Sequence, residues 1–92
     1  MPKPTIGRIV QFAMDPAQNN GADVAPAIIT RVWSDTCVNL RVLADSHAVD
    51  WKTSVPLFES RGALDAHLDQ LVSQGVVAEG SRPFGAFWPE RV

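Results

Sequence analysis

The sequence is poor in the features that mark disulfide-stabilised, zinc-binding and membrane-spanning proteins. Its one cysteine, Cys37, excludes an internal disulfide and any zinc site built from several cysteines. No apolar run approaches the roughly 18 residues that a transmembrane helix needs, so we expect no membrane partner. No apolar segment of signal-peptide type follows the N-terminal Met-Pro-Lys-Pro-Thr. We therefore expect a protein of the reducing cytosol, or of a particle assembled there.

The chain also has no excess of charge of one sign. Its 8 Lys and Arg residues stand against 10 Asp and Glu residues, so the net charge is -2 with both histidines neutral. A protein that holds nucleic acid by bulk charge would be basic, and nucleic acid is therefore disfavoured as a partner. The length of 92 residues predicts a single domain, 1–92, with a thin core.

No constellation typical of catalysis, metal binding or cofactor binding is present. The six glycines form no phosphate-binding loop. His47 falls in a turn and His67 on a helix, without the converging ligands that a metal requires. Cys37 begins an apolar segment and has no neighbouring base in the sequence. We therefore predict a protein that is not an enzyme and has no cofactor or metal site.

Alternating apolar and polar residues predict about five β-strands. The hairpin around the turn Ser34-Asp35-Thr36 has the strongest local pattern, because β-branched and aromatic residues flank a short polar turn. Pro56 would end the fourth strand or place it at a sheet edge. Residues 1–5 read as an extended tail and residues 15–26 as a loop available for contacts. The expected strands are Ile6–Phe12, Ala27–Trp33, Cys37–Leu43, Val49–Val55 and a closing strand within residues 84–88.

The periodicity then changes to that of a helix over about residues 61–74. Leu64, Leu68 and Leu71 form an apolar stripe, Ser60 can cap the start, and Gly75 suits the end. The helix lies in a segment, 59–83, that stands between the last two strands. The expected fold is mainly β: a small SH3-like or barrel-like antiparallel sheet with one helix before the last strand.

Large apolar residues exceed what so thin a core can hide. Three Trp, four Phe and a Leu-rich helix suggest that some apolar area faces a partner. The candidate interface residues are Leu64, Leu68, Leu71, Phe87 and Trp88, each of which also has an interpretation as core. An alternative nucleic-acid face would use basic residues in or beside the strands, with Trp33, Trp51 or Phe87 stacking on bases. These basic residues are Arg8, Arg31, Arg41 and Lys52.

Several segments together resemble one group of small proteins encoded by tailed bacteriophages and prophages. The segments are Ile6–Val10, Pro26–Trp33, Val38–Val42, Thr53–Pro56 and Phe87–Val92. Gln11 and Phe12 stand where the group has His and Tyr, and residues 59–83 look like an insertion. The resemblance implies a phage-encoded, β-rich protein and supplies no catalytic residue.

The expected function is that of a non-enzymatic accessory protein of the virion, assembled in the host cytoplasm. Such a subunit would bind capsid or another virion protein in multiple copies, as capsid-decoration proteins do, and homo-oligomers are compatible with it. The alternative is an intracellular phage effector that binds a host protein or nucleic acid through a small β-barrel. The resemblance favours a phage role, and the apolar surplus favours protein contacts.

Overall fold

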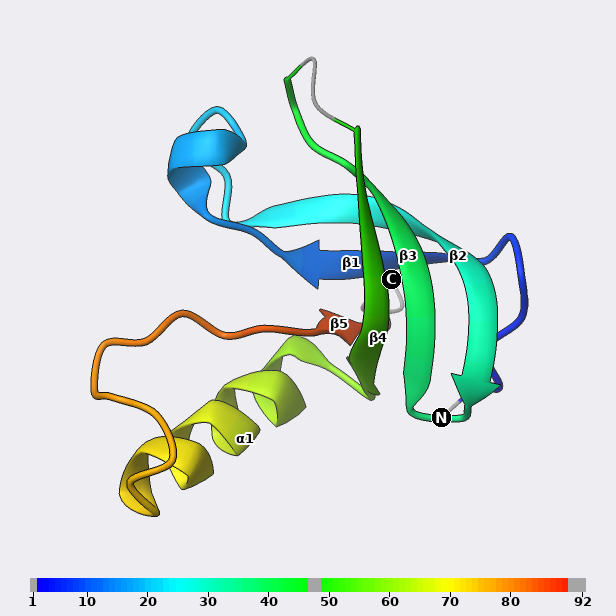
Figure 1. The fold of residues 1–92 in the computed structure, drawn as a ribbon. Coiled ribbons are helices and arrows are strands. Elements are labelled where there is room, and N and C mark those ends of the chain that lie inside the picture. Colours follow the sequence, from blue (N-terminus) through cyan, green and yellow to red (C-terminus); the bar gives the residue numbers. More distant parts are fainter. Residues whose placement is uncertain (1, 47–48, 90–92) are drawn as a thin grey trace.

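The computed structural model describes residues 2–46 and 49–89 and confirms the expected fold class (Figure 1). Five strands close a small barrel in the order β1-β2-β3-β4-β5, and the helix precedes the last strand. The elements are β1 (Ile9–Ala13), a 3-10 turn (Pro16–Gln18), β2 (Val24–Ser34), β3 (Cys37–Leu43), β4 (Val49–Phe58), α1 (Arg61–Ser73) and β5 (Ala86–Phe87).

Four of the five strand pairs are antiparallel, but the pair β4–β5 that closes the barrel is parallel. Parallel neighbours need a long connection, and here α1 and the segment after it provide the crossover. The closure is short, since β5 pairs with β4 only at Leu57 and Phe58 and with β1 only at Gln11 and Phe12. The expected antiparallel sheet is therefore correct except at its last pair.

The strand bounds differ from the expected ones for reasons of local backbone geometry. β1 begins at Ile9 rather than Ile6, because the chain turns at Gly7, whose φ is 92°. β2 begins at Val24, so the loop is shorter than residues 15–26. β4 continues through Pro56 to Phe58, since the amide that follows, Leu57 N–H, still donates to Thr36 C=O at 2.9 Å.

The inward-pointing side chains of all five strands fill the barrel interior. Along β3 the buried positions Val38, Leu40 and Val42 alternate with outward ones, as the period of two requires. Trp88, just after β5, joins this cluster. The cluster comprises Val10, Phe12, Ala25, Ala27, Ile29, Val38, Leu40, Val42, Val55, Leu57, Ala86 and Trp88.

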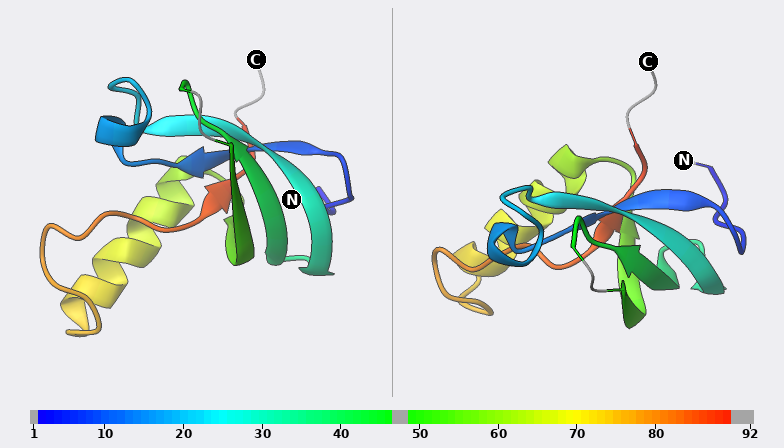
Figure 2. Two further views of the ribbon diagram at one scale, coloured as in Figure 1. Left: turned by 45° about the horizontal axis from the view of Figure 1, so that its top comes forward. Right: turned by 90° about the horizontal axis from the view of Figure 1, so that it is seen from above.

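A second, smaller core lies outside the barrel, where α1 packs beside β4 and β5. Leu64, which is 1% exposed, contacts Ala13 and Phe87 there, with Val24 and Phe58 at the margin. As expected, the Ser60 hydroxyl caps the helix by accepting from Ala63 N–H at 3.1 Å. Figure 2 shows α1 on one side of the barrel, away from β3 and from the turn that joins β2 to β3. The helix therefore leaves the outer surface of the β2–β3–β4 sheet uncovered.

At the end of α1, the backbone forms the expected glycine-terminated turn. Gly75 has a φ of 73° and donates to Val72 C=O at 3.0 Å, while Val76 N–H donates to Leu71 C=O at 2.9 Å. This bonding pattern is a Schellman motif, which satisfies the last free carbonyls of a helix. The helix ends at Ser73, one residue earlier than expected.

We expect Gly85→Ala to destabilise the fold by about 1–3 kcal/mol, because overpacking a tight contact forces its neighbours apart. A methyl group at Gly85 would lie 3.0 Å from Phe58 Cε2, 3.1 Å from Leu64 Cδ1 and 3.2 Å from Pro56 O. Gly62→Ala is the matched control: its methyl meets only Ser60 Oγ at 3.8 Å, and alanine favours the helix by up to about 1 kcal/mol. Urea unfolding measures both, and equal stability of the two variants would contradict the packing described here.

Candidate binding surface

Outward side chains of β2, β3 and β4 form one continuous surface, which we call the Trp–Arg face. Because Leu40 and Val42 point inward, their neighbours on β3 point outward. Arg41 lies between Ile28 of β2 and Trp51 of β4, and Leu43 lies opposite Val49. The face comprises Ile28, Arg31, Trp33, Asn39, Arg41, Leu43, Val49, Trp51 and Thr53.

This surface is unusually apolar for one that no helix covers. Trp33 and Trp51 are each 52% exposed, and Val49 is 55% exposed. Ile9 of β1, in register with Ile28, extends the apolar area and is also exposed. Single exposed apolar residues are ordinary, whereas a group of them across neighbouring strands marks an interaction surface.

The centre of the face is organised by the buried side chain of Asn39. Its Oδ1 accepts three hydrogen bonds, from Trp33 Nε1 at 2.9 Å, Thr53 Oγ1 at 3.0 Å and Ser54 N–H at 2.8 Å. At this point the β3–β4 register shifts, and Ser54 takes a φ of 55°. The irregularity is a β-bulge, which removes the Ser54 N–H from the hydrogen-bond ladder between the strands. Asn39 Oδ1 accepts a hydrogen bond from this N–H instead.

Two arginines give the face a positive charge. The Arg31 guanidinium lies 4.0 Å from the centroid of the Trp33 ring, which is a cation–π contact. Neither Arg31 nor Arg41 takes part in an ion pair within residues 2–46 and 49–89. Both side chains are exposed to solvent.

The other two basic residues of the alternative nucleic-acid face lie elsewhere. The Arg8 guanidinium is 5.3 Å from the centroid of the Trp88 ring. Lys52 points to the opposite side of β4, where its Nζ is 2.8 Å from Asp50 Oδ2. Hydrogen bonding and the positive charge of Lys52 hold the pKa of the Asp50 carboxyl below its usual value. The expected four-residue basic face is thus reduced to Arg31 and Arg41.

Three of the five candidate apolar interface residues belong to the core instead. Leu64, Phe87 and Trp88 are 1%, 4% and 7% exposed: Leu64 and Phe87 pack together between α1 and β5, and Trp88 lies in the barrel interior. Leu68 and Leu71 are half-buried and line a groove of about 250 Å³ against residues 77–84. The Leu stripe is therefore largely used by the chain itself, and its core interpretation is the one the structure supports.

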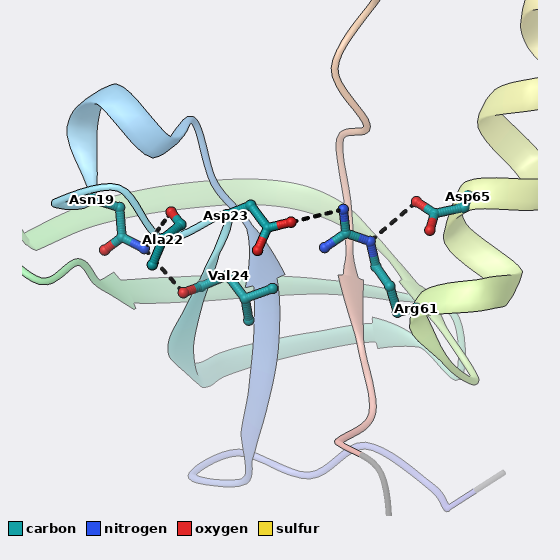
Figure 3. Close-up of polar contacts among 6 residues, drawn as sticks. All are labelled: Asn19, Ala22, Asp23, Val24, Arg61 and Asp65. Atoms are coloured by element: carbon teal, nitrogen blue, oxygen red, sulfur yellow. Dashed lines mark hydrogen bonds and ion pairs between the residues drawn. The ribbon is translucent and has the colours of Figure 1, made fainter.

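A wider cavity of about 630 Å³ opens beside the start of α1, between Gln11, Glu59 and Phe87. Arg61 at its wall is engaged structurally, as Figure 3 shows: Nη2 lies 3.5 Å from Asp23 and Nε lies 3.1 Å from Asp65. Near Asp23, the Asn19 amide donates to the carbonyls of Ala22 and Val24. These contacts tie the helix to the loop before β2.

Among the described residues, no group of three or more His, Cys, Asp or Glu side chains could hold a metal ion. His47 lies outside the described residues, His67 contacts the Phe58 ring, and Cys37 is half-buried. No helix in the described ranges has the length and apolar character to cross a membrane. The Trp–Arg face, with its exposed tryptophans and arginines, is the candidate binding surface of the described residues.

Comparisons of the chain with protein-family models, curated proteins and solved structures found no match. The resemblance to small phage proteins consequently stays a prediction that rests on the sequence segments alone. The function must be argued from the residues of the structure.

We expect Asn39→Ala to destabilise the protein by about 2–3 kcal/mol, since it leaves the Ser54 N–H and the Trp33 indole N–H without their acceptor. Asn39→Asp is the control, because it keeps an acceptor oxygen at the same place. Urea unfolding gives the stability, and the Trp33 indole N–H resonance in NMR gives the local order. An Asn39→Ala variant with unchanged stability and an unchanged resonance would show that the amide does not hold the face.

Proposed function

We propose that this protein is a non-enzymatic binding subunit that attaches to another protein through the Trp–Arg face. The observation that supports it is the exposure of two tryptophans and two arginines on a sheet surface that α1 does not cover, the arginines forming no ion pair with any described residue. Following the phage resemblance, we further propose that the partner is a capsid or other virion protein and that the subunit is present on the particle in many copies, in the manner of a decoration protein.

The residue types of the face suit protein recognition. Trp and Arg are enriched among the residues that contribute most to binding, and stable interfaces bury roughly 1,200–2,000 Å² in total. The candidate apolar residues Leu64, Phe87 and Trp88 lie in the two cores, whereas Trp33 and Trp51 share one sheet surface and remain half-exposed. The interface is therefore assigned to the sheet rather than to the helix stripe.

Pre-organisation is a second argument for this face. The indole of Trp33 is fixed on one side by Asn39 Oδ1 and covered on the other by Arg31. A side chain that is already ordered loses less conformational entropy when it is buried against a partner. Trp33 is thus suited to be the fixed anchor, with Trp51 and Arg41 completing the contact.

The positive charge of the Trp–Arg face indicates which charge the partner surface should have. The chain as a whole has a net charge of -2, but β2 and β3 direct Arg31 and Arg41 outward, while Asp50 pairs with Lys52 on the other side of β4. Opposite charge steers encounter and excludes wrong partners. The partner surface is expected to combine an apolar centre with carboxylates at its rim.

Single-stranded nucleic acid is a second candidate, favoured by the presence of Trp33, Trp51, Arg31 and Arg41 on one surface. Bases can stack on tryptophan rings while guanidinium groups contact phosphates. Since Arg31 and Arg41 are the cations that the described residues place on the face, the logarithm of affinity should fall with the logarithm of salt with a slope of about -2 or shallower. Titration of a labelled oligonucleotide at several salt concentrations measures that slope, and absence of binding at low salt removes this candidate.

We expect Trp51→Ala and Arg41→Glu to reduce incorporation of the protein into particles at least about tenfold, since each removes a contact of hot-spot type. Their unfolding free energy should change little, because both side chains are exposed. Val76→Ser is the control, because Val76 is 65% exposed but lies beyond the end of α1.

Quantitative mass spectrometry of purified virions from the source strain, after a high-salt wash, measures the copy number of each variant. Copy numbers in proportion to the major capsid protein support decoration. Wild-type protein that is abundant in infected cells and absent from particles would contradict a virion role and leave the intracellular effector as the leading account.

A further inference from the structure

Over Val49–Val55, one edge of β4 has no strand neighbour among the described residues. β4 pairs with β3 from Val49 to Pro56, but with β5 only at Leu57 and Phe58. Within the described residues, no strand or loop backbone bonds to the second edge of Val49–Val55. Figure 1 shows this part of β4 extending beyond the short β5 strand. An exposed edge of this kind presents unpaired N–H and C=O groups to any strand that can approach it.

The edge is accessible from both faces of the strand. Val49 and Trp51 are 55% and 52% exposed on the outer face, and the side chains of Asp50 and Lys52 are 60% and 36% exposed on the inner face. The bulge at Thr53 and Ser54 then changes the strand direction. The segment available for pairing is therefore residues 49–53.

This segment is complementary to itself in the antiparallel direction. When two copies pair about a two-fold axis at Trp51, Asp50 of each lies opposite Lys52 of the other on the inner face. On the outer face, Trp51 meets the second Trp51, and Val49 meets Thr53. Opposite charges, aromatic pairs and β-branched pairs are all favourable across neighbouring strands.

We propose that a second copy of this chain binds the free edge of β4, forming a two-fold dimer through antiparallel pairing of residues 49–53. The dimer joins the two sheets into one and brings the two Trp–Arg faces together at Trp51. A two-fold interface of this kind is self-complementary, as symmetric dimers require.

The charge pattern selects a second copy over other strands. An inward-pointing lysine at a sheet edge ordinarily deters a foreign strand. Here Asp50 and Lys52 lie on the same face and pair with each other at 2.8 Å. An antiparallel copy places an opposite charge beside both Asp50 and Lys52. A parallel copy in register would instead place Asp50 beside Asp50 and Lys52 beside Lys52. The dimer does not depend on the proposed virion function, because it involves only this chain.

Charge reversal tests the register directly in the full chain. Asp50→Lys and Lys52→Asp each convert two attractive pairs into two repulsive ones, and each should raise the dimer dissociation constant at least about tenfold. An equimolar mixture of these two variants should restore the dimer as a heterodimer. The double variant Asp50→Lys/Lys52→Asp should dimerise with itself, since it keeps the pattern. Asp69→Lys, with the same change of charge on the exposed face of α1, is the control.

Sedimentation-equilibrium centrifugation over a range of concentrations gives the dissociation constants, and native mass spectrometry identifies the heterodimer. Restoration in the mixture supports the proposed pairing even if a single variant is less stable. A wild-type chain that stays monomeric at every concentration would overturn the proposal, as would single variants that dimerise like wild type or a mixture that fails to restore the dimer. None of these results depends on whether the protein is found in particles.

Discussion

The Asn39 side chain is the constraint on which the arrangement of the Trp–Arg face depends. It points outward from β3 yet is 6% exposed, and one oxygen accepts from an indole, a hydroxyl and a backbone amide. A buried amide of this kind is stabilising only when its partners are in place, so it fixes their positions. It holds Trp33 against the sheet and accepts the N–H freed by the bulge at Ser54. The bulge in turn ends the regular part of β4 that carries Trp51.

The layout of the small core explains why the sheet, and not the helix, is available for binding. A chain of 92 residues can hide only part of its apolar surface, and here the barrel interior and the contact of α1 with β4 and β5 use most of it. Leu64 is buried in the second core. Leu68 and Leu71 face residues 77–84, the segment that leads from α1 to β5. What remains uncovered is the opposite side of the barrel. Its residues are aromatic, β-branched and basic, a composition suited to a partner with apolar and acidic character.

Sequence patterns predicted the elements whose determinants are local. The β2–β3 hairpin, the Ser60 cap and the Gly75 helix end depend on neighbouring residues, and the structure confirms them. Burial that depends on closure of the barrel could not be decided from the sequence. Phe87 and Trp88 had both an interface and a core interpretation, and the position of β5 between β4 and β1 decides for the core. The role of Asn39 left no periodic signal, because a polar residue at an outward strand position is ordinary. Lys52 and Arg41 lie on opposite faces of the sheet because Arg41 is in register with Trp51, and Lys52 is the next residue along β4.

Trp33 and Trp51 are exposed in the free chain, and the proposed binding would cover both. Oxidative footprinting with mass spectrometry measures this on one sample before and after assembly, with the buried Trp88 as an internal reference. We expect Trp33 and Trp51 to be oxidised in the free chain and protected at least severalfold in the assembled state, while Trp88 stays unreactive in both. Equal oxidation of Trp33 and Trp51 in the two states would contradict the claim that the Trp–Arg face is the binding surface.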